Sequence, residues 1–129
     1  MIGVMKYVIH IVRILLGLAF VVFGSNIFLH FIPGSDQMPP GDAGVFAGVL
    51  MRSGYMYVVG ALQVLGGICL LTGRLVPLGL ILLGPVIVNI VLFHIFFAPE
   101  GIAVGAVCAI MALFLLWVYR YKFPAIFNP

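Results

Sequence analysis

Four long apolar runs follow one another along the chain, separated by links that hold glycine, proline and charged residues. The runs cover residues 10–32, 54–71, 77–97 and 102–119. None of them alternates apolar and polar positions in the way that is typical of a membrane β-barrel strand. A helix crosses a bilayer with about 20 mostly apolar residues, and it satisfies its backbone hydrogen bonds within its own segment. The pattern therefore predicts an all-α integral membrane protein with four transmembrane helices in a single domain, residues 1–129.

The links between the runs predict how the helices are arranged. Residues 72–76 and 98–101 form tight links, and links this short make consecutive helices antiparallel neighbours in a bundle. The remaining link, residues 33–53, is long, and its first half has the prolines and glycines of a loop. Its second half, residues 42–52, predicts a short helix that Asp42 caps. We expect this helix to lie at the membrane interface, over the mouth of the bundle.

Glycines recur at spacing seven on the first two runs, at Gly17 and Gly24 and at Gly60 and Gly67. Helices in lipid associate through close packing at small residues. We therefore expect these glycines to pack the bundle itself, with a homo-oligomer as the open alternative.

Composition agrees with a membrane protein and excludes several other classes. Hydrophobic residues make up 65% of the 129 residues and charged residues only 7%, whereas a water-soluble domain carries about 25% charged residues. No segment resembles a nucleic-acid-binding module, so the net charge of +3 needs another explanation. We predict the lipid bilayer, and no nucleic acid, as the partner of the apolar surface.

The positions of the charges predict the topology. The three acidic residues all lie in the two links at residues 33–53 and 98–101, with Arg52 as the one basic residue on that side. The remaining basic residues cluster at the termini and in the link at residues 72–76. By the positive-inside rule, both termini and that link are cytoplasmic. The other basic residues are Lys6, Arg13, Arg74, Arg120 and Lys122.

Six polar side chains lie within the predicted spans and are the candidate site residues. Such groups are costly in hydrocarbon and usually face the protein interior or water. With a rise of about 1.5 Å per residue, both histidines fall in the outer third of the bilayer, the glutamine near its centre and the arginine near its inner end. The six are Arg13, Asn26, His30, Gln63, Asn89 and His94.

The candidates come in two similar pairs. Asn26 and His30 are four residues apart on the first span and would share one helix face. Asn89 and His94 are five residues apart on the third span and would share a face only in part. Arg13 either snorkels to the cytoplasmic interface or turns inward, where it would be a counter-charge for an anion.

Three interpretations of this polar cluster remain open. The histidines could hydrogen-bond a quinone or relay a proton, with the asparagines orienting the ligand and Gln63 forming the floor of a pocket. The cluster could instead hold the helices together by mutual hydrogen bonds of about 0.6 kcal/mol each and leave no cavity. Ligation of a metal or haem by His30 and His94 is disfavoured, because two histidines without a carboxylate or thiolate are a weak signature and no CxxCH motif is present.

The two cysteines argue against thiol–disulfide chemistry. Cys69 and Cys108 should differ in depth by roughly 10 Å, and a disulfide needs Cα atoms within about 7 Å. There is also no CxxC pair. We expect two free thiols.

An ordered set of short strings resembles a known family, from Arg13 to Tyr119. The strings are RILLGLAFVVFGSN (13–26), SGY (53–55), GGICLLTGR (66–74), VPL (76–78) and PVIVNIVLFH (85–94). In order and spacing they are similar to the DoxX-like family of small four-helix proteins of the bacterial inner membrane. Many members carry a lysine in a GLNK-like string on the first span, and Ile27 stands at that position here.

The resemblance implies a general role for the protein but no particular reaction. The family is named for a subunit of an archaeal quinone-linked thiosulfate oxidation system, and other relatives resemble partners of membrane redox complexes or assembly chaperones. We therefore predict an accessory subunit of a membrane redox system, with quinone as the candidate cofactor and redox proteins as candidate partners. A scaffold or chaperone for other membrane proteins is the alternative, and a transporter is a weaker third because no acidic residue lies within a span.

Overall fold

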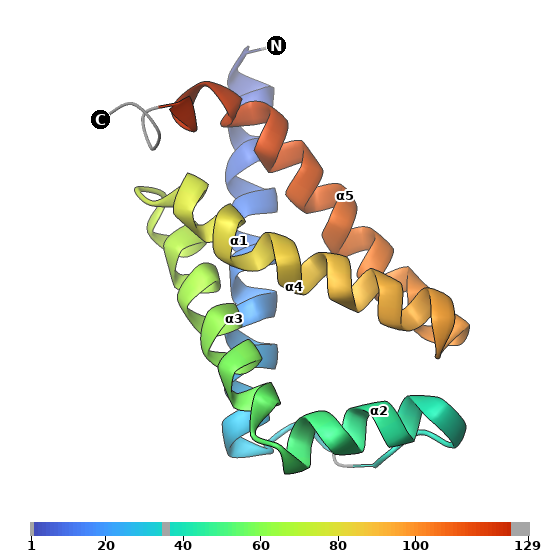
Figure 1. Ribbon diagram of the computed structural model, residues 1–129. Helices are drawn as coiled ribbons and strands as arrows, with labels where there is room; N and C mark the ends of the chain where they lie inside the picture. Colours follow the sequence, from blue (N-terminus) through green and yellow to red (C-terminus); the bar gives the residue numbers. More distant parts are fainter. Residues whose placement is uncertain (1, 35–36, 125–129) are drawn as a thin grey trace.

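The protein is all-helical over residues 2–34 and 37–124, which the computed structural model describes (Figure 1). Two short 3-10 helices, η1 and η2, accompany the α-helices. The helices are α1 (Ile2–Leu29), α2 (Gly41–Arg52), α3 (Tyr55–Thr72), α4 (Val76–Phe96), η1 (Pro99–Gly101), α5 (Ile102–Val118) and η2 (Arg120–Lys122). Within this part of the chain, four helical segments are long and apolar enough to cross a membrane: α1, α3, α4, and η1 together with α5. The predicted fold class, an all-α membrane protein with four spanning helices, is confirmed.

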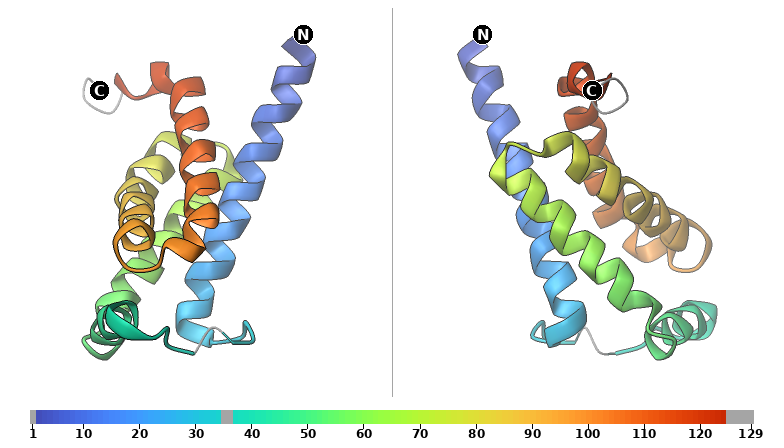
Figure 2. Two further views of the ribbon diagram at one scale, coloured as in Figure 1. Left: turned by 90° about the vertical axis from the view of Figure 1, so that its right-hand side faces the viewer. Right: turned by 60° about the vertical axis from the view of Figure 1, so that its left-hand side comes forward.

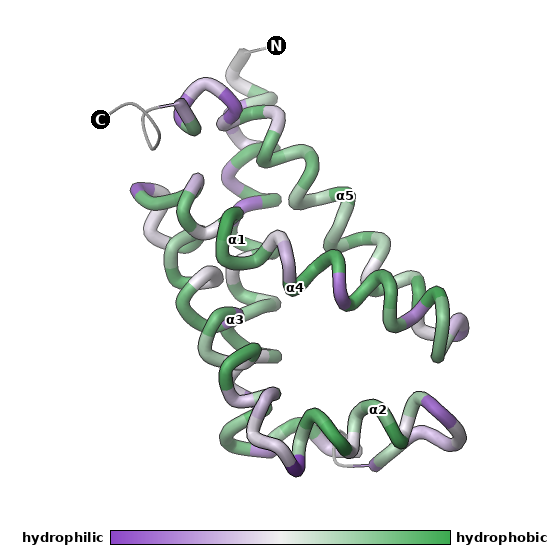
Figure 3. Tube along the Cα trace, viewed as in Figure 1, coloured by the Kyte–Doolittle hydropathy of each residue, from purple (hydrophilic) through white to green (hydrophobic). Residues whose placement is uncertain are grey.

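The four spanning helices form a ring in which chain neighbours pack side by side. Helix α1 packs against α3 and α5, and α4 packs against α3 and α5 (Figures 1 and 2). The start of α1 and the end of α5 lie at one end of the bundle, and α2 lies across the other end (Figure 2). Figure 3 shows apolar positions along most of each spanning helix, with polar positions gathered near the helix ends and single ones within α1 and α4. The short helix therefore lies over the bundle end, as an interfacial helix would.

Helices α1 and α3 approach closely because glycines face each other. A Cβ atom at Gly67 would lie 2.7 Å from the Gly17 carbonyl oxygen, and one at Gly24 would lie 2.9 Å from the Gly60 carbonyl oxygen. Any larger residue at these positions would force the two backbones apart. The predicted packing role of these four glycines is confirmed.

The core lies toward the end of the bundle that holds the link between α3 and α4. Leu16 of α1, Leu70 of α3, Leu83 of α4 and Leu115 of α5 are fully buried in one cluster. From this cluster α3 and α4 diverge as they run toward the α2 end (Figure 1). The divergence leaves the space in which the candidate site lies.

Two helix starts differ from the sequence-based prediction. The prediction that Asp42 caps α2 is wrong: Pro40 is the N-cap residue, no side chain caps the helix, and Asp42 lies in the first turn. The helix begins at Gly41, one residue before the predicted range of 42–52, and Gly41 has a φ of 72°. An acid in the first turn still interacts favourably with the helix dipole. Helix α1 begins at Ile2, earlier than the predicted span start at residue 10, because a helix can continue beyond the hydrocarbon that sets the span length.

Candidate functional site

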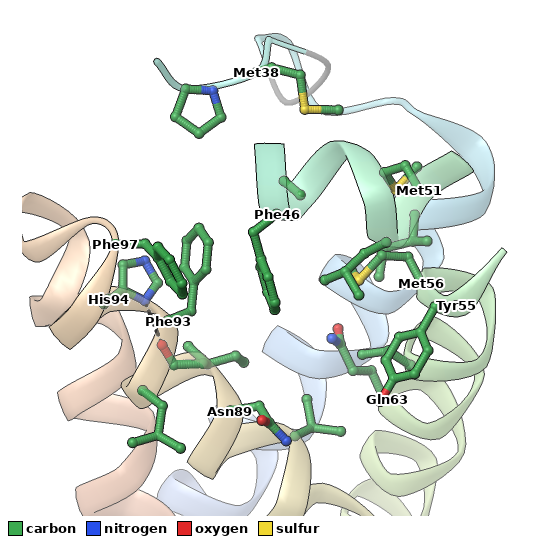
Figure 4. A pocket seen from close by; sticks show the side chains of 18 of the residues that line it. Met38, Phe46, Met51, Tyr55, Met56, Gln63, Asn89, Phe93, His94 and Phe97 are labelled. Carbon is green, nitrogen blue, oxygen red and sulfur yellow. Dashed lines mark hydrogen bonds between the residues drawn. The ribbon is translucent and has the colours of Figure 1, made fainter. Parts of the chain in front are cut away.

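A large cavity lies between α2, α3, α4 and the end of α1. Its volume is about 1390 Å³, and its walls are mostly apolar. Phe46 projects into it from α2, and Met51, Met56 and Tyr55 lie on the side where α2 meets α3 (Figure 4). Ligand pockets in proteins typically measure about 300–1,000 Å³ and combine apolar walls with a few placed polar groups. The cavity is therefore large enough for a ligand with a polar head and part of an apolar tail.

Five of the six candidate residues predicted from the sequence line this one cavity. They come from three different helices and from the residue that follows α1. The five are Asn26, His30, Gln63, Asn89 and His94.

Gln63 is the most deeply buried polar group of the cavity. Its side chain is 6% exposed, and no hydrogen bond of its amide occurs among the described residues. Across the same residues every fully buried side-chain nitrogen or oxygen has a partner, so the Gln63 amide must open to the cavity, as Figure 4 shows. An unpaired buried amide costs about 1–3 kcal/mol. A ligand that hydrogen-bonds this amide would recover that free energy.

Asn89 and His94 both bond to the backbone of their own helix. The Asn89 Nδ2 atom donates to the Pro85 carbonyl at 2.8 Å, and His94 Nδ1 lies 2.8 Å from the Ile90 carbonyl oxygen. His94 stands edge-on to Phe93, with ring centroids 5.3 Å apart. Within the described chain, Gln63, Asn89 and His94 make no hydrogen bond to one another. The arrangement thus differs from a dry cluster that only ties helices together.

His94 owes its position to a glycine of the next helix. A Cβ atom at Gly101 would lie 2.6 Å from His94 Cδ2 and 2.8 Å from Nε2. The missing side chain gives the imidazole room between α4 and η1. The nitrogen nearer Gly101 is Nε2.

Asn26 lies on the last turn of α1, and His30 follows directly after the helix ends at Leu29. His30 has a φ of 52°, in the left-handed region, and its N–H donates to the Asn26 carbonyl at 2.8 Å. The Asn26 Oδ1 atom accepts a hydrogen bond from the Ile32 N–H at 2.8 Å. Asn26 therefore helps to terminate α1, and His30 projects from the turn that follows.

Arg13 lies outside the cavity, at the opposite end of α3. It is 9% exposed, and its Nη1 atom donates to the carbonyls of Leu70 and Leu71 at 2.6 and 2.9 Å. Its Nη2 atom lies 3.3 Å from His10 Nδ1. The guanidinium therefore satisfies the last carbonyls of α3, where the helix dipole is negative. The side chain thus turns inward, which is one of the two predicted orientations, and there it bonds to the end of a neighbouring helix.

Three aromatic rings close one side of the cavity, and sequence reasoning did not assign them to a site. Phe46 of α2 stacks on Phe97 at 5.3 Å between ring centroids and lies 5.8 Å from Phe93. Phe93 of α4 and Phe97, the residue that follows α4, have centroids 5.9 Å apart. Two features of the sequence could have indicated this contact. Phe93 and Phe97 are four residues apart, as on one helix face, and Phe46 lies on the apolar side of residues 42–52.

Metal-ligating and thiol groups are dispersed. Among the residues that the structure describes, no three His, Cys, Asp or Glu side chains could hold a metal ion together. Cys69 is buried, Cys108 is half-buried, and both are free thiols. The chemistry of the cavity therefore depends on amides, imidazoles and aromatic rings.

Comparison with known proteins shows which family the chain resembles. A family model named DoxX matches residues 8–98, which include most of α1, all of α2 to α4 and all six candidate residues. The chain is 36% identical over 74 residues to "Uncharacterized protein YwoB" of Bacillus subtilis (strain 168). That match covers 57% of this chain and 48% of the relative, so the chain spans about half the length of this relative. No solved structure matches. With the family model covering most of its length, the chain belongs to the DoxX family.

Proposed function

We propose that this DoxX-family membrane protein binds a quinone-type molecule in the cavity and serves as an accessory subunit of a quinone-linked membrane redox system. One observation carries the proposal: a cavity of about 1390 Å³ with apolar walls collects five polar side chains. A quinone has a flat ring with polar oxygens and an apolar tail. The ring would meet the polar groups, and the tail would lie along the phenylalanines and methionines.

The residues of the cavity have distinct roles in this proposal. His30 and His94 would hydrogen-bond the quinone oxygens or relay protons to them, since imidazole both donates and accepts. Asn89, with Asn26 at the end of α1, would orient the ring. Gln63 would form the floor, where its open amide favours a polar ligand atom. Arg13 would act only through the end of α3, because its bonds are to Leu70 and Leu71.

The proposed location is the bacterial inner membrane, with both termini in the cytoplasm and the cavity toward the outer face. Support comes from the basic residues at one end of the bundle, where Arg74, Arg120 and Lys122 lie, and from the positive-inside rule. Single cysteines introduced at Lys122 and at Val45 would test it in cells. An impermeant thiol reagent should label the Val45→Cys variant and spare the Lys122→Cys variant, and the reverse pattern would refute the orientation. A background variant without Cys69 and Cys108 removes the native thiols.

The ligand itself can be sought directly. The protein would be purified in a mild detergent and extracted with organic solvent, and the extract would be analysed for quinones by absorption and mass spectrometry. We expect a quinone in roughly stoichiometric amount and its loss from the Gln63→Met variant. Wild-type protein that carries no quinone and binds none when it is added would count decisively against this function. The His30→Gln and His94→Gln variants test the relay: full quinone-linked activity of membranes carrying both changes would exclude it.

A membrane chaperone or scaffold is the second candidate, and the methionines of the cavity favour it. Met38, Met51 and Met56 all line the cavity, and flexible methionine side chains are common on surfaces that accept varied apolar partners. In this case a helix of a client protein would fill the space beneath α2. A photo-crosslinking amino acid at Met56 should then capture a protein, whereas the quinone proposal expects crosslinks to small molecules or lipid. The same crosslinker at Val107, on an exposed part of α5, is the matched control.

A further inference from the structure

One wall of the cavity is also part of the outer surface of the bundle. Along α4, one stripe of side chains both lines the cavity and is exposed, with Leu92 43% and Phe96 73% exposed. The stripe has the spacing of a single helix face and consists of Pro85, Asn89, Leu92 and Phe96. A side chain that lines a cavity and is also exposed lies at an opening of that cavity. The cavity therefore opens along this stripe.

The opening lies between α3 and α4 and faces the bilayer. The face of α4 that contacts α5 holds Ile90 and Val91, which adjoin Gly105, and at about 100° per residue the exposed stripe is on roughly the opposite side of the helix. On α3, Tyr55 and Leu62 line the cavity at a spacing of seven, again on one helix face. The two helices diverge toward α2 (Figure 1). Both are long and apolar enough to cross a membrane, so the gap between these two faces opens to hydrocarbon.

Two amides lie at similar depth on the two sides of this gap. Gln63 is eight residues from the start of α3 at Tyr55, and Asn89 is seven residues from the end of α4 at Phe96. With a rise of about 1.5 Å per residue, both lie about 10–12 Å from these helix ends. Gln63 is 6% exposed and directed into the cavity (Figure 4), whereas Asn89 is exposed at the opening. A polar head that moves in from the side would meet Asn89 first and Gln63 last.

We infer that the ligand is an amphiphile dissolved in the membrane, which enters sideways between α3 and α4 and keeps its apolar tail in that gap. The inference rests on the proposed function, which supplies the quinone head. The cavity holds this head and part of a tail, so the rest of the tail must lie outside it. Another exposed part of the lining, Gln37 and Met38, belongs to the loop at the bundle end. Methylene groups are more stable in hydrocarbon than in water, so the tail favours the gap over this loop.

The position of the tail can be mapped on the wild-type protein. The full-length protein in nanodiscs would be incubated with a benzoquinone that carries a photoreactive diazirine partway along a decyl tail, then irradiated and digested for mass spectrometry. We expect crosslinks at Leu62, Leu92 or Phe96, suppressed by an excess of unlabelled decyl-benzoquinone. A quinone that binds but gives no suppressible crosslink at these three residues would overturn the inference and leave the proposed function standing. A quinone that does not bind at all would overturn both.

The Leu92→Trp variant tests the route of entry. The larger side chain narrows the gap, so decyl-benzoquinone should associate about tenfold more slowly, which equals about 1.4 kcal/mol in the barrier. Val88→Trp is the matched control, because Val88 is 57% exposed on the same helix but lies outside the lining of the cavity. It should leave the association rate unchanged. Equal rates for the two variants would overturn the sideways route, and the mapping of the tail needs no variant, so a poorly folded mutant would not obscure the result.

Discussion

The two ends of the bundle are built from the same four helices but differ in how tightly these helices pack. At the end near the link between α3 and α4, Leu70 and Leu83 are fully buried and a Cβ atom at Gly66 would lie 2.6 Å from Leu83 Cγ. At the α2 end, α3 and α4 have separated, and a cavity of about 1390 Å³ takes the place of the core. The comparison shows a division of roles: one end holds the fold together, and the other offers space for a ligand.

Pro85 lies where α4 passes from one region to the other. A proline within a helix removes one backbone hydrogen bond and commonly bends the axis. The polar residues Asn89 and His94 follow it, while the buried Leu80 and Leu83 precede it. The buried residues Val86 and Ile87 follow it directly, so the packed part of α4 extends about one turn past the proline before the cavity wall begins.

Enlarging a glycine in the packed region should have the largest effect. Gly67→Val would place a Cβ atom 2.7 Å from the Gly17 carbonyl oxygen, and backbone atoms cannot move aside as a flexible side chain can. Overpacking costs about 1–3 kcal/mol or more, so we expect a loss of at least about 3 kcal/mol in stability, measured by denaturation in mild detergent. Gly84→Ala is the control, because a Cβ atom at Gly84 meets nothing within 4 Å. Equal losses for the two variants would contradict the tight contact of α1 and α3.

Removing the guanidinium at the end of α3 should come next. Arg13→Met keeps an apolar stem but leaves the carbonyls of Leu70 and Leu71 without their donor. Hydrogen bonds to charged groups contribute about 1.5–3 kcal/mol, so we expect a loss of about 2 kcal/mol in the same denaturation experiment. Quinone binding should persist in the folded fraction. A stability equal to wild type would mean that Arg13 does not hold the end of α3.

Removing the aromatic contact between α2 and α4 should affect the open region and spare the packed one. Phe46→Ala removes two ring contacts, with Phe93 and Phe97, and aromatic pairs contribute about 0.5–1.5 kcal/mol each. We expect a stability loss of about 1 kcal/mol and faster thiol labelling of a Met56→Cys variant within the cavity. Val45→Ala, on an exposed part of α2, should change neither. Unchanged labelling after Phe46→Ala would show that this ring does not cover the cavity.

The smallest change in stability, and a local one, should follow from Gly101→Ala. The new methyl group would collide with the His94 ring, 2.6 Å from Cδ2, but a side chain can rotate away at a cost of about 0.5–1.5 kcal/mol. We expect a stability loss below about 1 kcal/mol and a drop in ligand affinity similar to that of His94→Gln. The ring signals of His94 in NMR spectra should shift, while Gly84→Ala leaves them in place. Unshifted signals would show that Gly101 does not position the imidazole.

Several features of the site could be predicted residue by residue, and others could not. Gln63, Asn89 and His94 were identifiable because polar groups in an apolar span seldom lack a protein or water environment. Their common cavity was not identifiable, because it depends on where α3 and α4 diverge. The position of His30 just beyond the end of α1 was not predicted, because the helix end at Leu29 depends on a turn with a left-handed residue. The contact of Arg13 with α3 could not be predicted either, because it requires that the end of α3 lies beside Arg13 in the folded bundle.

The sequence by itself determined the membrane class, the four spanning helices and the glycines that pack α1 against α3. Those features follow from local rules: the bilayer requires a minimum apolar length, and the backbone must satisfy its own hydrogen bonds there. Only the tertiary structure decided that one end of the bundle is packed and the other is hollow. The physical reason is that a cavity depends on the angles between helices and on the docking of α2 through Phe46, and these arise from contacts between residues far apart in the chain.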